Sequence, residues 1–131
     1  MNKINMNLAV VILNWNQAPA TIRCVEAVAA WTHVAPDIWV VDNASQDGSR
    51  DLIPKQCPTA HVLASDSNLG FAGGNNLALR RIMSSPSDVV LLLNNDAVIA
   101  EDQVQHLLAE LETNPSLGVV GPVLDEPSGG S

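Results

Sequence analysis

Three polar residues, Asn94, Asn95 and Asp96, follow directly on an unbroken apolar run from Val89 to Leu93. A short run of β-branched residues and leucines is typical of a strand buried on both faces, as in a parallel sheet covered by helices. The polar residues would then lie at the carboxyl end of the strand, where open α/β sheets bind their ligands. A carboxylate beside two amides is suited to a divalent cation that carries phosphates. A turn rich in Asn and Asp is the alternative interpretation.

A second carboxylate, Asp42, follows the apolar run of residues 38–41 in the same way. At such a position a carboxylate accepts hydrogen bonds from a ribose hydroxyl or from the imide N–H of a base. The alternative is a local turn, in which Asp42 accepts the backbone amide of Ala44 or Ser45. We favour the binding role for Asp42. For residues 47–49 we favour a turn, with Asp47 or Ser49 capping a short helix.

The segment GFAGGNN, residues 70–76, opens a predicted helix. Glycines allow a backbone to approach a ligand closely, and a helix N-terminus presents free amides to an anion. The segment is neither a P-loop nor a GxGxxG motif, so a simple tight turn remains the alternative. Asn75 and Asn76 are poor helix formers, which favours a contact role.

Other candidate residues carry weaker signals. We expect Trp15 to pack at the edge of the sheet, with stacking on a base as the alternative. His33, His61 and His106 show no metal-ligand spacing and are interpreted as structural or surface residues. Neither a Ser/His/Asp set nor a Cys/His set is visible in the sequence.

The elements that must position these residues alternate between strand and helix. Apolar runs predict strands at residues 8–13, 38–41, 61–64, 89–93 and 117–123, and helical spacing predicts the four intervening helices. The second helix is expected to end at Pro54. This order predicts an α/β fold with a mainly parallel sheet and helices on both faces. Right-handed crossovers would gather one set of residues at one edge: Asn14, Trp15, Asn16, Asp42, Asn43, Asp66, Asn68, Asn94, Asn95 and Asp96.

The composition predicts one domain, residues 1–124, followed by a disordered tail at residues 125–131. A net charge of −8 argues against nucleic acid or an anionic membrane as a partner. A nucleotide remains compatible, because a bound cation supplies local positive charge. No run reaches the ~20 apolar residues of a membrane-spanning helix, and residues 1–6 are too polar for a signal peptide. Cys24 and Cys57 are expected to be free thiols of a cytoplasmic protein.

Four motifs, VVILNWN, VVDNASQDGS, SNLGFAGGNN and VLLLNND, occur in this order along the chain. Their order and spacing resemble the N-terminal half of family 2 glycosyltransferases, which have the GT-A fold, and most of all the bacterial rhamnosyltransferase-like branch. The resemblance extends over residues 8–123. It implies a Rossmann-like, truncated donor-binding domain.

The resemblance implies that the domain binds a nucleoside-diphosphate sugar, either a dTDP-sugar such as dTDP-rhamnose or a UDP-sugar, together with Mg²⁺ or Mn²⁺. The sugar would pass to a saccharide or lipid-linked acceptor. Asp96 would hold the metal with help from Asn94, which stands where the family more often has an aspartate and so lowers the expected metal affinity. The implied donor-site residues are Asn14, Trp15, Asn16, Asp42, Asn43, Asn68, Gly73, Asn76, Asn94 and Asn95.

Family members run well beyond 131 residues, and their second half supplies acceptor contacts and a carboxylate general base. We therefore expect no catalytic residue and little turnover from this chain alone. Self-association through the surface left by the missing half, and a peripheral position at the inner membrane face, are further expectations. The alternatives are a non-catalytic nucleotide-binding or interaction module, in effect a pseudoenzyme fragment, and a sugar-phosphate nucleotidyltransferase. The latter is disfavoured because residues 14–21 lack Arg and Lys.

Overall fold

The computed structural model describes residues 6–114. The predicted fifth strand (117–123) and tail (125–131) lie outside them. The described elements, in chain order, are β1 (Leu8–Asn14), α1 (Ala18–Ala29), β2 (Asp37–Asn43), α2 (Ser49–Gln56), β3 (His61–Ser65), α3 (Gly70–Ile82), β4 (Val89–Leu93) and α4 (Glu101–Thr113). Residues 6–98 form one compact unit that contains all of these strands, while α4 belongs to a second unit and is described by itself.

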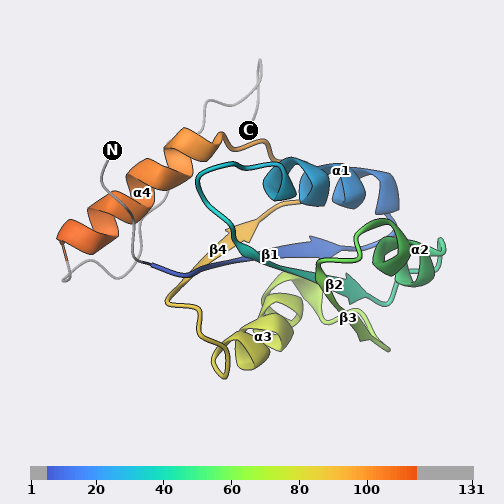
Figure 1. Cartoon of the computed structure of the whole chain (residues 1–131). Coiled ribbons are helices and arrows are strands. Elements are labelled where there is room, and N and C mark those ends of the chain that lie inside the picture. The colour runs from blue at the N-terminus through green and yellow to red at the C-terminus, as the bar shows by residue number, and fades with distance from the viewer. Residues whose placement is uncertain (1–5, 115–131) are drawn as a thin grey trace, which may run out of the picture. The chain divides into compact units, whose positions relative to one another are not determined.

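The four strands form one parallel sheet in the order β3-β2-β1-β4. In this register Asn14 at the end of β1 lies opposite Asp42 of β2, and Asn43 lies opposite Ser65 of β3. Figure 1 shows α1 and α2 on one face of the sheet and α3 on the other. The prediction of a parallel α/β sheet with helices on both faces is confirmed.

The two central strands are buried on both faces, because their side chains alternate between two layers. On one face, Ala9 and Val11 of β1 and Trp39 and Val41 of β2 form a cluster with Ala78 and Ile82 of α3. The alternate residues Val10, Ile12 and Val40 are fully buried on the opposite face. By the same alternation, Asn14 and Asp42 emerge on the α1 side of the sheet. The pleat therefore decides which helix each polar residue can reach.

Strand β4 departs from the expectation of burial on both faces. Leu93 is buried, but Leu92 is 45% exposed and the first three residues are half-buried. The reason is that β4 pairs with β1 alone within the described part of the chain. An apolar run indicates a strand, but it does not show whether the strand is central or at an edge.

The expectation that Pro54 ends the second helix was wrong, because α2 continues through Pro54 to Gln56. A proline inside a helix removes one backbone hydrogen bond. Here Pro54 lies in the last turn of α2, so the helix continues for only two residues beyond it. The helix starts after Gly48, whose φ of 87° lies in the left-handed region. The Asp47 carboxylate accepts the Ser49 amide at 2.9 Å, which forms the predicted turn, but Gly48 occupies the cap position.

Helix α3 begins at Gly70, the first residue of the segment that was predicted to open a helix. Its buried residues are Gly74, Asn75, Ala78 and Ile82. Met83 follows the last helical residue and is 85% exposed. Helix α4 starts with Glu101 and Asp102, and acidic residues there favour a helix N-terminus. Among the described residues, every helix is too short or too polar to cross a membrane.

A methyl group on Gly74 would lie 2.6 Å from Leu13 Cδ2 and 3.0 Å from Asn43 Nδ2. Alanine normally stabilises a helix by about 1 kcal/mol relative to glycine. Here the crowding outweighs that gain, and we expect Gly74→Ala to lower the free energy of unfolding by about 1–2 kcal/mol in urea titrations. Asn76→Ala, at an exposed position of the same helix, is the control and should leave stability unchanged or slightly higher. Equal stability of Gly74→Ala and the native chain would contradict this packing.

Candidate functional site

A cleft of about 360 Å³ opens at the carboxyl edge of the sheet, where the sequence predicted a ligand site. Its volume falls in the range of small-molecule sites. The residues that line it are Leu13, Asn14, Trp15, Gln17, Asn43, Asn68, Gly70, Phe71 and Asn95. None of these residues carries a charge. An anionic ligand would therefore depend on backbone amides or on a cation for its charge compensation.

The structure brings together part of the predicted donor site. Five of the predicted residues line the cleft: Asn14, Trp15, Asn43, Asn68 and Asn95. The others lie outside its lining: Asn16, Asp42, Gly73, Asn76, Asn94 and Asp96. Sequence reasoning did not assign Leu13 and Gln17 to the site, and it proposed a ligand contact for the segment of residues 70–76 without singling out Gly70 or Phe71. Gly70 and Phe71 begin the glycine-rich motif and Gln17 follows NWN directly, so proximity to these motifs was the available signal.

Trp15 is 55% exposed, which is contrary to the expectation that it packs at the sheet edge. Phe71, in the first turn of α3, is 62% exposed and lines the same cleft. Exposed aromatic side chains at a cleft provide flat apolar surfaces on which a base or another planar group can stack. The position of Trp15 therefore allows the alternative that the sequence left open, which is stacking on a base.

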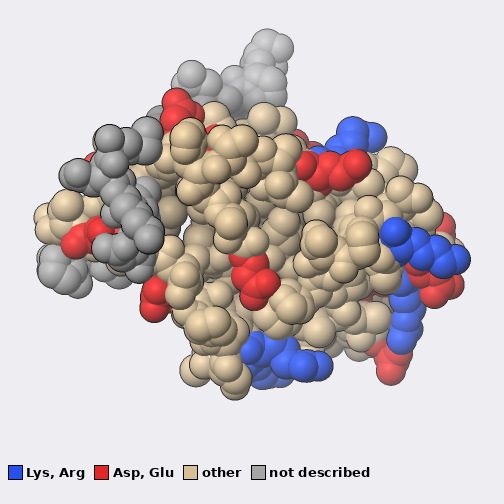
Figure 2. Space-filling view, viewed as in Figure 1, with Lys and Arg blue, Asp and Glu red and all other residues tan. Residues whose placement is uncertain are grey.

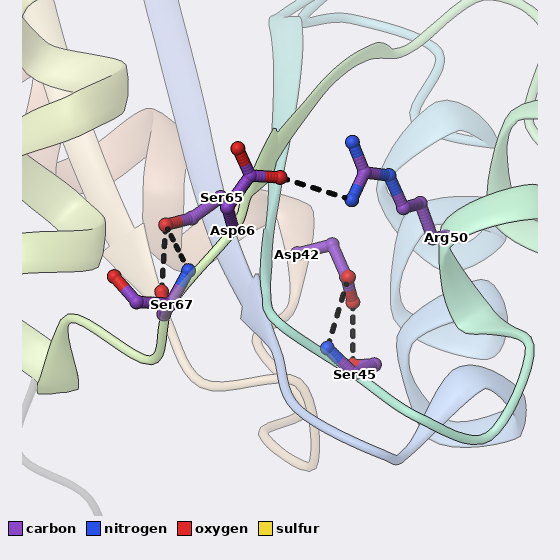
Figure 3. A network of polar contacts seen from close by, with 6 residues as sticks. All are labelled: Asp42, Ser45, Arg50, Ser65, Asp66 and Ser67. Atoms are coloured by element: carbon purple, nitrogen blue, oxygen red, sulfur yellow. Dashed lines mark hydrogen bonds and ion pairs between the residues drawn. The ribbon is translucent and has the colours of Figure 1, made fainter.

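Asp42 is completely buried and is held by hydrogen bonds within the protein. Its Oδ1 accepts Asn14 Nδ2 at 2.8 Å and Ser45 Oγ at 2.5 Å, and its Oδ2 accepts the Ser45 amide at 3.2 Å. Figure 3 shows the Asp42 carboxylate facing Ser45. The local turn that the sequence offered as an alternative is thus formed. These bonds offset the cost of burying a carboxylate.

The loops after β1 and β2 are fastened to each other. The Asn16 amide donates to Ser45 Oγ at 2.8 Å, and Asn16 Oδ1 accepts the Gln46 amide at 2.7 Å. Asn16 and Ala44 have φ values of 54° and 63°, in the left-handed region that is costly for residues other than glycine. Backbone conformations of this kind persist where surrounding contacts impose them, and they concentrate at functional sites.

On the other face of the sheet, Asn43 ties β2 to the start of α3. Its Oδ1 accepts the Leu69 amide at 3.0 Å and its Nδ2 donates to the Gly70 carbonyl at 3.0 Å. Asn68 Oδ1 accepts the Gly70 amide at 2.9 Å. Gly70 has a φ of 73°, which glycine adopts without strain. Both asparagines therefore shape the loop that forms one wall of the cleft.

The residues after β4 form a turn, in which the Ala97 amide donates to the Asn94 carbonyl at 3.0 Å. The Asn95 amide group donates to Gln17 Oε1 at 3.0 Å and to Thr21 Oγ1 at 3.1 Å, so α1 holds the turn. The side chains of Asn94 and Asp96 are exposed. We call residues 94–97 the NND turn.

The NND turn fits one particular kind of metal binding. Within residues 6–114, no three side chains of His, Cys, Asp or Glu are grouped closely enough to enclose an ion. Mg²⁺ commonly takes one or two protein carboxylates and completes its octahedron with water and substrate phosphates. An exposed Asp96 beside an Asn94 amide suits a cation that arrives with a diphosphate, and does not suit a cage made by the protein alone.

Charged side chains are sparse around this fold. Figure 2 shows that the Lys and Arg side chains on the face in view lie over α1, α2 and α3. Asp66, which was predicted at the ligand edge, pairs with Arg50 at 3.3 Å, with both side chains more than half exposed (Figure 3). Such surface pairs contribute little to stability. Asp66 is thus a suitable control for substitutions of Asp96.

His61 has a packing role, as expected. Its ring stacks on Trp39 with centroids 4.1 Å apart, and its Nε2 lies 2.8 Å from Asp37 Oδ1. Trp39 Nε1 donates to the other oxygen of Asp37 at 3.1 Å. These residues lie at the start of β2 and of β3, the end of each strand that is remote from the cleft.

The model of the family described as "Glycosyl transferase family 2" matches residues 9–130. The chain belongs to glycosyltransferase family 2. An uncharacterized glycosyltransferase from Nostoc sp. is 30% identical over 118 residues, which cover 88% of this chain and 36% of that protein. The N-acetylglucosaminyl-diphospho-decaprenol L-rhamnosyltransferase of Mycobacterium tuberculosis is 22% identical over 130 residues, covering 93% of this chain and 42% of that protein. This family 2 chain thus spans between 36% and 42% of the length of these two relatives.

Solved structures agree with the family assignment at the level of the fold. The mannosyltransferase PcManGT from Pyrobaculum calidifontis, in complex with GDP-Man and Mn²⁺, superposes with a TM-score of 0.71 at 21% identity, covering 81% of this chain and 32% of that one. TarS from S. aureus superposes with a TM-score of 0.64 at 20% identity, covering 92% of this chain and 39% of that one. The predicted GT-A fold is confirmed.

Both cysteines are free and buried, as expected. Burial, and next the charge of Asp96, raises the pKa of the Cys24 thiol to about 11.

The thiolate is the form of cysteine that reacts with thiol reagents, and an ordinary cysteine has a pKa of about 8.5. In a Cys57→Ala background, native Cys24 should therefore react much more slowly at pH 8 than an ordinary cysteine does. The rate should climb as the pH approaches 11. Asp96→Asn should raise the rate at pH 8 and Asp66→Asn should not. Rapid labelling of native Cys24 at pH 8 would contradict the assigned environment.

Proposed function

We propose that this chain is the donor-binding domain of a glycosyltransferase, and that its cleft binds the nucleoside diphosphate of an activated sugar. The observation that carries the proposal is the cleft itself. The cleft of this family 2 chain has exposed aromatic residues on its walls and lies beside a turn that presents a carboxylate. Asn95 lines the cleft and Asp96 is the next residue.

At the nucleoside end, Trp15 and Phe71 offer apolar surfaces to a base. Asp42 contributes in a different way from the one that the sequence suggested. It lies behind the cleft and holds Asn14, which lines the cleft. Because Asp42 is completely buried, a ribose or base would reach its carboxylate only after the residues that cover it moved. In the proposed site Asp42 therefore orients the Asn14 side chain, and Asn14 contacts the nucleoside.

At the diphosphate end the uncharged lining and the net charge of −8 favour a bound cation as the source of charge compensation. Asp96, assisted by the Asn94 amide, would hold Mg²⁺ or Mn²⁺, and Asn95 would keep the turn in place through Gln17 and Thr21. When bound, such a cation stabilises the negative charge of the departing diphosphate. Asn94 adds no charge, so the diphosphate itself must contribute much of the attraction for the cation.

For the donor we propose a dTDP-sugar, such as dTDP-rhamnose, or a UDP-sugar, and for the acceptor a saccharide or lipid-linked saccharide. The relative from Mycobacterium tuberculosis is named as an L-rhamnosyltransferase, which supports the first of these, while the structural neighbour binds GDP-Man, so GDP belongs in any test. Among the described residues no carboxylate lines the cleft. We therefore propose that the base for the acceptor hydroxyl comes from outside this domain, and that the chain alone turns over little substrate.

Thermal unfolding with UDP, dTDP and GDP, each with and without Mn²⁺, tests this proposal. A ligand at 100 times its dissociation constant stabilises the folded state by about 2.7 kcal/mol, which shifts the melting temperature of a domain of this size by several degrees. We expect a shift that depends on Mn²⁺, that is lost in Asp96→Ala and that is retained in Asp66→Ala. A shift independent of metal would instead indicate a non-catalytic nucleotide-binding module, and no shift with any nucleotide would refute the donor site.

Trp15→Ala tests the nucleoside end of the cleft. Stacking of a base on an aromatic side chain contributes about 1–3 kcal/mol, so the substitution should weaken UDP or dTDP binding in the presence of Mn²⁺ by roughly 5- to 150-fold. Trp15→Phe should keep part of the affinity. Leu52→Ala, which truncates an exposed apolar residue on α2, should bind as the native chain does. Calorimetric titration measures the dissociation constants, and an unchanged value for Trp15→Ala would exclude the stacking role.

A further inference from the structure

We propose that Thr21 of α1 is a positioning residue that couples the NND turn to the nucleoside end of the cleft. The inference rests on the proposed function, because it concerns how the two ends of that donor site are held relative to each other. Thr21 is completely buried and does not line the cleft. It would therefore act through its neighbours and not through contact with the donor.

The Thr21 hydroxyl joins two parts of the site. It donates to Asn14 Oδ1 at 2.6 Å and accepts Asn95 Nδ2 at 3.1 Å. Asn14 in turn donates to Asp42 Oδ1 at 2.8 Å. A continuous path of hydrogen bonds thus runs from the turn after β4, through α1 and the end of β1, to the carboxylate of β2.

The direction of these bonds explains why a hydroxyl is needed at this position. A side-chain amide has a donor end and an acceptor end, and Asn14 must turn its donor end toward the Asp42 carboxylate. Its oxygen then requires a donor on the α1 side, which Thr21 supplies. The same hydroxyl oxygen accepts from Asn95. Valine has the same shape but would leave the Asn14 oxygen without this donor, and buried polar groups without partners are costly.

Helix α1 holds the NND turn with three side chains on one face. Gln17, Thr21 and Cys24 are spaced at i, i+4 and i+7, which places them in one row along the helix. Gln17 and Thr21 both accept from Asn95, and the Cys24 thiol lies 3.8 Å from the Asn94 carbonyl. Of these three, Thr21 is the one that is also bonded to β1.

This arrangement has a thermodynamic consequence. If a cation on Asp96 and a nucleoside in the cleft both favour one arrangement of the path, each strengthens the binding of the other by the same factor. That factor is the dissociation constant of the nucleoside diphosphate without Mn²⁺ divided by its value with Mn²⁺. Breaking the path at Thr21 should reduce the factor even where the cleft and Asp96 are both intact.

The experiment is a calorimetric titration of the full chain with UDP and dTDP, with and without Mn²⁺. We expect Thr21→Val to lower the coupling factor about tenfold, which corresponds to the loss of one buried hydrogen bond. Thr21→Ser keeps the hydroxyl and should restore the factor. Val28→Ala is the control for lost stability, because Val28 is a buried residue of the same helix outside the path. It should lower the melting temperature and leave the factor unchanged.

The outcomes separate this inference from the proposed function. If the native chain binds none of the nucleotides, the proposed function fails. If it shows metal-enhanced binding and Thr21→Val keeps the same factor, the coupling role is overturned and the donor site stands. A loss of the factor in Val28→Ala equal to that in Thr21→Val would also overturn it, since the effect would then follow stability alone. Should Thr21→Val fail to fold, Asn95→Ala breaks the same bond from the turn and must lower the factor likewise.

Discussion

One fully buried amide, that of Asn14, holds the functional edge of this fold together. It ends the strand that lies between β2 and β4, and its hydrogen bonds reach Asp42, Ser45 and Thr21. A buried amide with a missing partner destabilises the folded state, so these groups must all be in place at once. Because Asn14 lines the cleft, the shape of the cleft depends on the register of β1 with β2 and on the packing of α1 against the sheet.

The consequence for function is a site that supplies shape but almost no charge. The lining consists of amides, aromatic rings, an aliphatic side chain and a glycine, within a protein of net charge −8. Long-range electrostatics do not attract a diphosphate to such a surface, so the charge compensation has to be local. Under the proposed function, the exposed Asp96 carboxylate would recruit the cation that supplies this local charge.

Two segments that border the cleft, the NND turn and the start of α3, are held in place by different residues. Gln17 at the N-cap of α1 and Thr21 within the helix fix the NND turn by accepting hydrogen bonds from Asn95, while the buried Cys24 thiol, whose pKa is raised, lies near the turn. The start of α3 is fixed separately, through Asn43 and Asn68. The cleft is therefore bounded by two independently anchored segments, and this explains how loops rich in asparagine and glycine adopt defined conformations.

The sequence by itself determined the order of the elements, the parallel sheet and the edge at which polar residues gather, because apolar runs and strand-end positions follow directly from residue order. It also identified the motifs whose order marks family 2. Only the tertiary structure decided which strand-end side chains face the cleft. Asp42 turned inward because Ser45 and Asn14 satisfy it, Trp15 remained exposed, and β4 became an edge strand in the described part of the chain. Thr21 joined the site because a helix brought its hydroxyl between two asparagines that lie far apart in the sequence. Residue order places a side chain along a strand or helix, whereas its hydrogen-bond partners depend on which elements pack against it.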